Sequence, residues 1–242
     1  MGQLVKVEIA DGVVTVTLDS PANRNALSQQ LLADLHDAFD AAEQAGARAI
    51  ILTHTPPAFC AGADLKERLA GKVDSTSFVR AIERIGQMSA PVVAAVDGPV
   101  RAGGIGVMAA CDLVVVNSST TFAFTEVRIG VAPAIVSAPV LQRCGWSKLA
   151  SPFLTGEVFD SAAALDMGLV THVTQDVAAT VGELTRNLLL GAPNALAATK
   201  ALLRRPHTMS ELQAMSESLF ASEEGREGMA AFAQKRAPNW AE

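Results

Sequence analysis

The chain has 242 residues, and its 50% hydrophobic content is enough for a sizeable buried core, which excludes a mainly disordered protein. The net charge of −6 comes from 19 basic and 25 acidic residues that are mostly interspersed, so nothing indicates a nucleic-acid partner. No apolar stretch reaches the ~20 residues that a membrane span needs. The first residues do not resemble a secretory signal, so we expect a cytoplasmic protein without a membrane partner.

The chain opens with a predicted β-hairpin. Residues 4–10 and 13–18 alternate apolar and polar side chains on either side of Asp11 and Gly12. An Asp-Gly pair supplies the positive φ angles of a tight turn, so the two segments are expected to pair as antiparallel strands.

Further along the chain, the period of the apolar residues changes repeatedly between that of a helix and that of a strand. The expected elements are a helix over 28–44 capped by Ser28 and ended by Gly46, a strand over 49–53, a helix from about Asp64, a helix over 77–88, a strand over 91–96, a helix from about Gly103, and a strand over 113–116. From Ser161 the pattern is mostly helical, interrupted at 170–173, with helices over 178–190, 195–205, 210–224 and 225–234. This order predicts a mainly parallel sheet with crossover helices and an apolar helical end that completes its burial against another subunit.

Cysteine and histidine spacing gives no sign of a metal site. Cys60, Cys111 and Cys144 are far apart and form no C-x-x-C pair, so we expect them to be small packed side chains. The four histidines are dispersed, with no H-E-x-x-H motif. We therefore predict no bound metal.

Two short loops have a composition suited to chemistry. One covers 59–64 and the other 97–104, and each runs from a predicted strand into a predicted helix. The first turn of a helix leaves backbone N–H groups free, and small residues allow a ligand to approach them. If the loops lie side by side, one N–H from each can hold a single oxygen, although both can also be ordinary strand-to-helix turns.

These loops belong to a set of short motifs that resembles the enoyl-CoA hydratase and isomerase enzymes of the crotonase superfamily. The motifs occur in the family's order along essentially the whole chain. They are FCAGADLKE at 59–67, the stretch 91–112 ending in AACD, EVRIGV at 126–131, LTG at 154–156, Ala163 and Leu165 with GLV at 168–170, and REGMAAF at 226–232 with Lys235 and Arg236.

The resemblance implies a fold, a site and a substrate. It implies an α/β crotonase-like (ClpP/crotonase) spiral of ββα units over residues 1–190 with the CoA and acyl site, and a helical oligomerisation region over 191–242 that forms trimers or dimers of trimers. It implies that the amides of Ala63 and Gly103 hold the oxygen of an acyl-CoA thioester while Glu126 acts as acid or base, where the residues alone suggest a surface or helix-capping carboxylate. Coenzyme A is then part of the substrate, and no separate cofactor is expected. The residues expected at the CoA and substrate site are Arg24, Ala61, Asp64, Leu65, Lys66, Gly104, Phe232 and Lys235, of which the last two can come from a neighbouring subunit.

The sequence departs from the family pattern at two places in the expected acyl pocket. Hydratases of the family usually carry a second glutamate three residues beyond the oxyanion glycine, and here that residue is Gly106. Hydration suits a pair of carboxylates, so a single-glutamate Δ3-Δ2 enoyl-CoA isomerase is a serious alternative, while Gly106 can also make room for a bulky acyl group. The second departure is the absence of the family's glycine-rich turn after Pro133. Arg101 is unusual in this position and is expected to form a salt bridge rather than orient a polar acyl group.

Two further functional classes remain as alternatives. A non-catalytic CoA-binding protein could have lost the second glutamate, although Glu126 is present. The spacing of Gly104, Gly106 and Ala109 matches a loose dinucleotide-binding pattern, which suggests a nicotinamide-dependent oxidoreductase. In that motif the first glycine follows its strand directly, whereas seven residues separate Val96 from Gly104 here. This alternative is therefore distant.

Overall fold

A computed structural model describes residues 2–71 and 74–241. The first residue of the predicted 1–190 region and the last residue of the predicted 191–242 region therefore lie outside the described residues. The larger sheet has the strand order β1-β2-β3-β4-β6-β9, and a smaller sheet has the order β5-β7-β8. The strands are β1 (Val5–Ala10), β2 (Val13–Leu18), β3 (Ala49–His54), β4 (Val92–Val96), β5 (Val100–Arg101), β6 (Leu113–Asn117), β7 (Thr121–Ala123), β8 (Phe159–Asp160) and β9 (His172–Thr174). In the larger sheet, β1 and β2 pair antiparallel and the remaining neighbours pair in parallel, as predicted.

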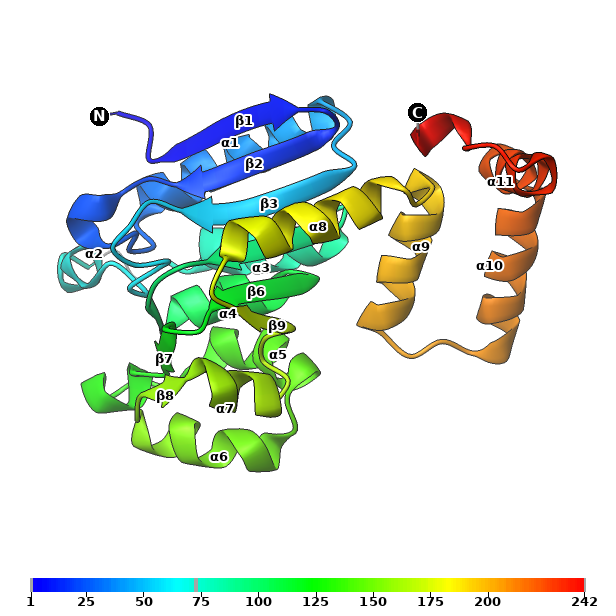
Figure 1. The fold of residues 1–242 in the computed structure, drawn as a ribbon. Coiled ribbons are helices and arrows are strands. Elements are labelled where there is room, and N and C mark those ends of the chain that lie inside the picture. The colour runs from blue at the N-terminus through cyan, green and yellow to red at the C-terminus, as the bar shows by residue number, and fades with distance from the viewer. Residues whose placement is uncertain (1, 72–73, 242) are drawn as a thin grey trace.

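Helices cover both faces of the larger sheet (Figure 1). They are α1 (Gln29–Gln44), α2 (Leu65–Leu69), α3 (Thr76–Gln87), α4 (Gly103–Ala110), α5 (Ala134–Arg143), α6 (Trp146–Thr155), α7 (Ser161–Asp166), α8 (Val177–Leu189), α9 (Pro193–Arg204), α10 (Met209–Ala221) and α11 (Glu223–Gln234), with 3-10 turns at Pro21–Asn23, Glu126–Ile129 and Asn239–Ala241. The main core lies on the face covered by α1, α3 and α4, and a smaller cluster around Val93, Val115 and Val181 lies under α8.

Local sequence explains most of these boundaries. Asp11 and Gly12 both have positive φ between β1 and β2, as the Asp-Gly turn predicts. The Ser28 hydroxyl accepts a hydrogen bond from the Leu31 N–H and caps α1. Beyond the end of this helix, Gly46 has φ +64°. The hairpin, the first helix and the next strand are therefore confirmed to within one or two residues.

The stretch from 117 to 160 contains elements that the periodicity did not predict. Helices α5 and α6 contain Pro139 and Pro152, which normally end a helical pattern. Strands β5, β7 and β8 have only two or three residues, too few to show an alternation. These short strands matter because the pairing of β5 with β7 joins the second predicted loop to the segment that precedes Glu126.

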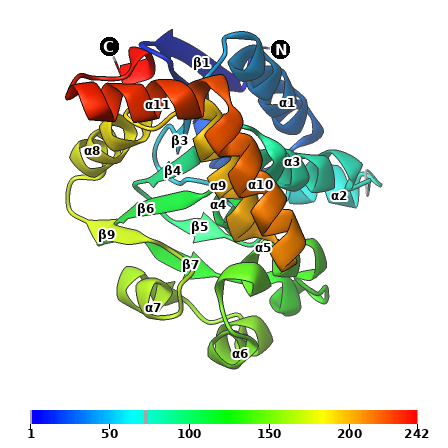
Figure 2. The same ribbon diagram turned by 90° about the vertical axis from the view of Figure 1, so that its right-hand side faces the viewer.

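The last three helices lie at one end of the molecule. Figure 1 shows α10 and α11 at the far right, well away from α2, and Figure 2 shows the same helices from that side. Predicted helices over 195–205, 210–224 and 225–234 correspond to α9, α10 and α11. Within the described ranges, no helix combines the length and apolar composition needed to cross a bilayer.

Candidate active site

Two loops meet at the carboxyl ends of β3 and β4. The Phe59 N–H donates to the Pro99 carbonyl at 3.1 Å, and the Arg101 N–H donates to the Cys60 carbonyl at 2.9 Å. Parallel strands place their carboxyl ends at one edge of a sheet, where α/β proteins commonly bind ligands. The side-by-side arrangement expected for the loops at 59–64 and 97–104 is therefore present.

Glycine is required where the two loops touch. A Cβ atom on Gly104 would lie 2.6 Å from the Cβ of Cys60, closer than real side chains approach. Gly62 has φ +93°, and a Cβ there would lie 2.9 Å from the Cβ of Ala102 and 3.6 Å from the nitrogen of Gly103. The first loop is thus held within contact distance of the start of α4.

The amides of Ala63 and Gly103 are free of partners within the described residues. Leu27 pairs with Ala63 as a parallel bridge, but its bonds run to the Gly62 carbonyl at 2.8 Å and from the Asp64 N–H at 3.5 Å. The Ala63 N–H therefore has no acceptor among the residues that the structure describes. Gly103 is the first residue of α4, whose opening N–H groups have no intrahelical acceptor. Both donors are available to an oxygen that approaches this edge.

Glu126 follows a strand that is bonded to the second loop. Strand β5 pairs in parallel with β7, and the Ala102 N–H donates to the Ala123 carbonyl at 3.0 Å. Three residues after Ala123, Glu126 begins a 3-10 turn. This pairing connects the segment that carries the acid to the residue that precedes Gly103.

The Glu126 carboxyl has the properties of a candidate acid or base. Burial raises its pKa above the usual range of a glutamate, although its own backbone N–H partly opposes the shift. Its Oε2 atom is buried and has no hydrogen-bond partner in the described structure. Because an unpaired buried carboxyl oxygen costs free energy, it calls for a functional explanation. The placement of all three groups around one thioester carbonyl remains a prediction.

Of the eight residues expected at the CoA and substrate site, Gly104 lies against Cys60 in the first turn of α4, and the other seven fall into two groups. Arg24, Ala61, Asp64, Leu65 and Lys66 gather at the start of α2, where the Ala61 N–H donates to the Arg24 carbonyl at 3.0 Å. Asp64 caps α2 by accepting from the Lys66 N–H at 2.9 Å. Phe232 and Lys235 are exposed on and just after α11, which Figure 1 shows on the opposite side of the molecule from α2. One chain therefore does not bring the two groups together.

Gly106 and Pro133 are buried in protein contacts. A Cβ on Gly106 would lie 3.4 Å from the Ile82 Cδ1, and equally 3.4 Å from the Cα and Cγ2 of Val136. Pro133 precedes α5, and this helix carries Val136. Side chains of α3 and α5 therefore lie within ordinary contact of Gly106, and room for a bulky acyl group at this position stays a prediction.

Arg101 does not form the expected salt bridge. In the part of the chain that the structure describes, its guanidinium donates to the carbonyl of Val100 at 2.9 Å and to that of Thr121 at 2.6 Å, and to the Thr121 hydroxyl at 3.0 Å. The pairing of β5 with β7 places these neutral acceptors within its reach. Burial lowers the pKa of Arg101.

Sequence reasoning missed two side chains that hold these loops. The buried Asn25 amide donates to the carbonyls of Thr55 at 3.1 Å and Ala58 at 2.8 Å. Nε2 of His54 accepts a hydrogen bond from the Asp97 N–H at 3.0 Å, and burial lowers the pKa of His54. The position of His54 at the end of a strand was the available signal for its role. Asn25 stands in a loop whose fold gave no periodic pattern.

The cysteines are packed as expected. Cys60, Cys111 and Cys144 are free thiols with at most 2% exposure. Burial raises the pKa of both Cys60 and Cys111 to about 12, which makes reactive thiolates unfavourable.

The dinucleotide-binding alternative does not agree with the structure. Strand β5 lies between β4 and α4 and pairs with β7, so Gly104 does not close the turn after β4. The close first-glycine turn that a dinucleotide motif requires is therefore not formed here.

Comparison with known proteins identifies the class to which this fold and site belong. The family model described as enoyl-CoA hydratase/isomerase matches residues 8–242. A crystal structure of an enoyl-CoA hydratase/isomerase from Marinobacter aquaeolei covers 100% of both chains, with a TM-score of 0.91 and 29% identity. The crotonase-like fold predicted from the motifs is thus confirmed.

The chain belongs to the enoyl-CoA hydratase/isomerase family and is an enzyme of that family. The enoyl-CoA hydratase EchA19 of Mycobacterium tuberculosis is 32% identical over 97% of this chain and 95% of that protein. The enoyl-CoA isomerase/hydratase fer4 of Mycosarcoma maydis is 29% identical over 94% of this chain and 92% of that protein. Names of relatives thus include both reactions.

Proposed function

We propose that the protein moves the double bond of an enoyl-CoA thioester, with Glu126 as its one acid–base group. The observations that carry this proposal are the half-buried Glu126 carboxyl, whose Oε2 atom has no hydrogen-bond partner in the described structure, and the glycine at position 106 in place of a second glutamate. The side chains nearest to Gly106 are those of Ile82 and Val136, which are apolar. These neighbours therefore offer no second carboxylate beside Gly106, which supports a reaction that needs only one.

One carboxyl group is sufficient for this reaction. The Glu126 carboxylate takes a proton from C2 of a 3-enoyl thioester, and the electron pair moves toward the thioester oxygen. The amides of Ala63 and Gly103 stabilise this charge, a contribution of about 3 kcal/mol for each donor. Protonated Glu126 then returns the proton to C4, which leaves the double bond between C2 and C3. The cycle consumes no other reagent, so we propose that coenzyme A acts as part of the substrate and that no resident cofactor takes part.

Hydration is the second candidate, because relatives such as EchA19 are named hydratases. In that reaction Glu126 would act together with a water molecule, and a water would add across the double bond. The substrate, the oxyanion hole and the acid are shared by both reactions, so only the products distinguish them.

The decisive experiment supplies 2-enoyl-CoA and 3-enoyl-CoA thioesters of several lengths and follows the products by mass and absorbance. Isomerisation leaves the mass unchanged and converts the 3-enoyl substrate to the conjugated, more strongly absorbing thioester. Addition of one water to the 2-enoyl substrate would establish hydration instead. Tight binding of both thioesters without any product would establish a non-catalytic CoA-binding protein and overturn the proposal.

We also propose that the chain functions as a trimer or a dimer of trimers. The C-terminal helices expose large apolar side chains, with Leu203 at 82%, Phe220 at 65% and Phe232 at 88% exposure. Such surfaces are costly in water and are usually covered. The separation of Phe232 and Lys235 from α2 within one chain supports a CoA site shared between subunits. Light scattering coupled to gel filtration tests the assembly, and the cytoplasmic location stays a prediction from the sequence.

A further inference from the structure

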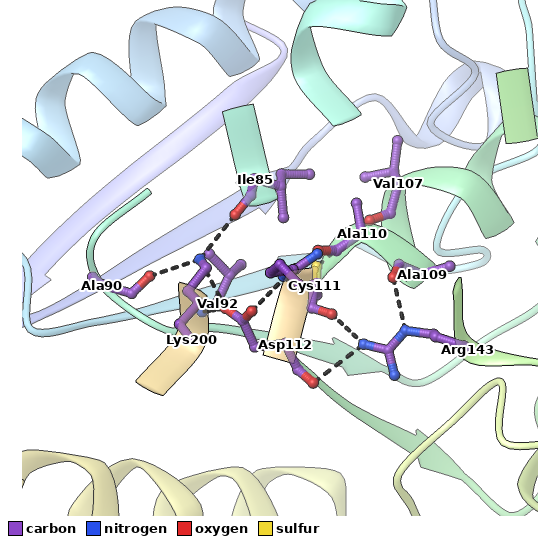
Figure 3. Close-up of polar contacts among 11 residues, drawn as sticks. Ile85, Ala90, Val92, Val107, Ala109, Ala110, Cys111, Asp112, Arg143 and Lys200 are labelled. Carbon is purple, nitrogen blue, oxygen red and sulfur yellow. Dashed lines mark hydrogen bonds and ion pairs between the residues drawn. The ribbon is translucent and has the colours of Figure 1, made fainter. Parts of the chain in front are cut away.

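Two arginines hold the carboxyl end of α4, the helix whose first residue is Gly103. Arg143 Nε donates to the Ala109 carbonyl at 2.7 Å, and Arg143 also bonds the Cys111 carbonyl. Arg204 donates to the Ala110 carbonyl at 2.8 Å. A helix leaves its last carbonyls without intrahelical partners, so these contacts complete the end of α4. Figure 3 shows the Arg143 side chain reaching the carbonyls of Ala109 and Cys111.

A buried ion pair fixes the same end to the C-terminal region. Asp112 accepts from the Val92 N–H at 2.8 Å, pairs with Lys200 Nζ at 2.9 Å, and also pairs with Arg204. The Lys200 ammonium, whose residue is 6% exposed, also donates to the Ile85 carbonyl at 2.9 Å, near the end of α3 (Figure 3). Lys200 and Arg204 both belong to α9, so this helix is bonded directly to the ends of α3 and α4.

The charges of this cluster match the helix ends that they contact. Lys200 and Arg204 pair with the carboxylate of Asp112, and Arg143 donates to the backbone carbonyl of the same residue at 3.2 Å. The carboxyl end of a helix carries the negative end of its dipole, which favours nearby cations. The arginines therefore complement the negative end of the α4 dipole as well as its free carbonyls. The positive end of the same dipole carries the Gly103 amide.

Packing surrounds helix α4, but its own side chains supply no polar contact that fixes its position along its axis. All eight of its residues are buried, and no side chain of Ala102 caps its start. At about 1.5 Å per residue the helix spans only about 12 Å, so a shift at one end is transmitted to the other. Gly104 lies against Cys60 with no side chain of its own. The contacts at the carboxyl end are thus the specific polar anchor of the helix.

We propose that Arg143 and Arg204 are positioning residues that aim the Gly103 amide at the thioester oxygen. They contact the far end of α4, not the substrate, and their effect passes through the helix. This inference rests on the proposed oxyanion role of Gly103. It also makes α9 part of the catalytic apparatus, because the C-terminal region supplies Arg204 and the Asp112 partner Lys200.

The test uses the full-length chain with Arg143→Met, Arg204→Met and a matched control, Arg48→Met. Arg48 is also a partly buried arginine that donates to backbone carbonyls, at Leu189 and Gly191, but it does not touch α4. The readout is the carbonyl stretching band of a saturated acyl-CoA with a ¹³C-labelled thioester carbonyl, which does not react and reports polarisation by the two amides. Turnover of the enoyl-CoA substrate and thermal unfolding are measured on the same samples.

Arg143→Met and Arg204→Met are both expected to lose at least half of the band's downshift. Their kcat should fall by about ten- to a hundredfold, as expected for a catalytic group displaced by a fraction of an ångström to one ångström, while KM changes less than about threefold. Arg48→Met should lower thermal stability without changing the downshift. An unchanged downshift in both Arg143→Met and Arg204→Met, or an equal loss in Arg48→Met, would overturn the inference.

Conservative variants keep the test decisive if the methionine variants do not fold. One nitrogen of Arg204 makes both of its contacts, so Arg204→Lys should retain the downshift and most of kcat. Arg143 uses two nitrogens on three carbonyls, so Arg143→Lys should fold but recover only part of the downshift. Equal behaviour of the two lysine variants would contradict the inference. A wild-type protein that shows neither downshift nor turnover would instead refute the proposed function.

Discussion

The Ala102 N–H donates a 3.0 Å hydrogen bond to the carbonyl of Ala123. This bond joins the residue before Gly103 to the strand that leads into Glu126, across 21 residues of sequence. The proposed oxyanion donor and the proposed acid therefore lie on adjacent paired segments and not on independent loops. A change in one segment is expected to be felt by the other.

Replacing Glu126 by glutamine is expected to abolish turnover while thioester binding persists. The amide keeps the shape of the side chain but cannot take up or release the proton, and loss of a positioned acid or base typically costs about 10²–10⁴ in rate. The measurement is kcat on the enoyl-CoA substrate together with the Kd for a saturated acyl-CoA. Glu157→Gln, on an exposed side chain that bonds Ser151, serves as the matched control. Equal activity of both variants would remove Glu126 from the mechanism.

The reaction is expected to lose rate on the acid side with an apparent pKa above 4.5, the ordinary value for a glutamate. Burial raises the pKa of Glu126, and only its ionised form can take the first proton. The profile of kcat/KM against pH should show this limb in the wild type and in Glu157→Gln. An acid limb that falls at or below 4.5 would contradict the role of burial.

The same shift predicts how stability changes with pH. The folded chain binds the Glu126 proton more tightly than the unfolded chain, so the free energy of unfolding falls as pH rises from about 4.5 through the raised pKa. Glu126→Gln has no such group. Relative to this variant, the wild type should therefore lose stability across that window and show no further change at higher pH. Urea unfolding at a series of pH values measures the difference, and a wild-type stability that rises with pH across this window, relative to Glu126→Gln, would have the wrong sign.

The sequence predicted the parts of the fold that repeat over many residues. Alternation around Asp11 and Gly12, and the apolar stripe after Ser28, specified the hairpin and α1 because each pattern covers several periods. Family motifs predicted the two loops and the crotonase-like fold. In contrast, β5 and β7 have too few residues to show a period, yet their pairing joins the second loop to the strand that leads into Glu126.

Side-chain partners were harder to predict than elements. Arg101 was expected to find a carboxylate, but the pairing of β5 with β7 gives it the carbonyl and hydroxyl of Thr121. The bonds from Arg143 and Arg204 to the end of α4 join segments that are 32 to 94 residues apart. Contacts at such separations depend on the tertiary fold, and no local pattern specifies them.

Two glycines of α4 should respond in opposite ways to alanine. A Cβ on Gly104 would lie 2.6 Å from the Cβ of Cys60, so Gly104→Ala must push the first turn of α4 away from its neighbour. Overpacking of this kind costs about 1–3 kcal/mol, and displacement of the Gly103 amide should lower kcat by about a hundredfold. On Gly106 the new Cβ meets its neighbours at 3.4 Å, an ordinary contact, and alanine favours a helix over glycine by about 0.5–1 kcal/mol.

Gly106→Ala should therefore leave stability unchanged or slightly higher. Because the new Cβ makes only ordinary contacts, kcat should stay within about threefold of the wild type, which corresponds to a barrier change of less than about 1 kcal/mol. Urea unfolding and steady-state kinetics on both variants measure the contrast. If Gly106→Ala were the more damaging of the two, the assigned contacts of α4 would be wrong.

Ala102→Gly is expected to stabilise the protein. Ala102 has φ 47° and ψ −122°, a backbone conformation that a residue with a Cβ adopts only at a cost of about 1–3 kcal/mol. Glycine removes this strain, and its greater freedom in the unfolded chain returns about 0.5–1 kcal/mol of the gain. The net increase is about 1 kcal/mol, or roughly 2–4 °C in Tm for a chain of this length, measured at fixed protein concentration. Ala123→Gly is the matched control, because Ala123 is the buried neighbour on β7 and does not have a positive φ angle. That variant should lose stability, and an equal loss in Ala102→Gly would mean that the backbone before Gly103 stores no strain.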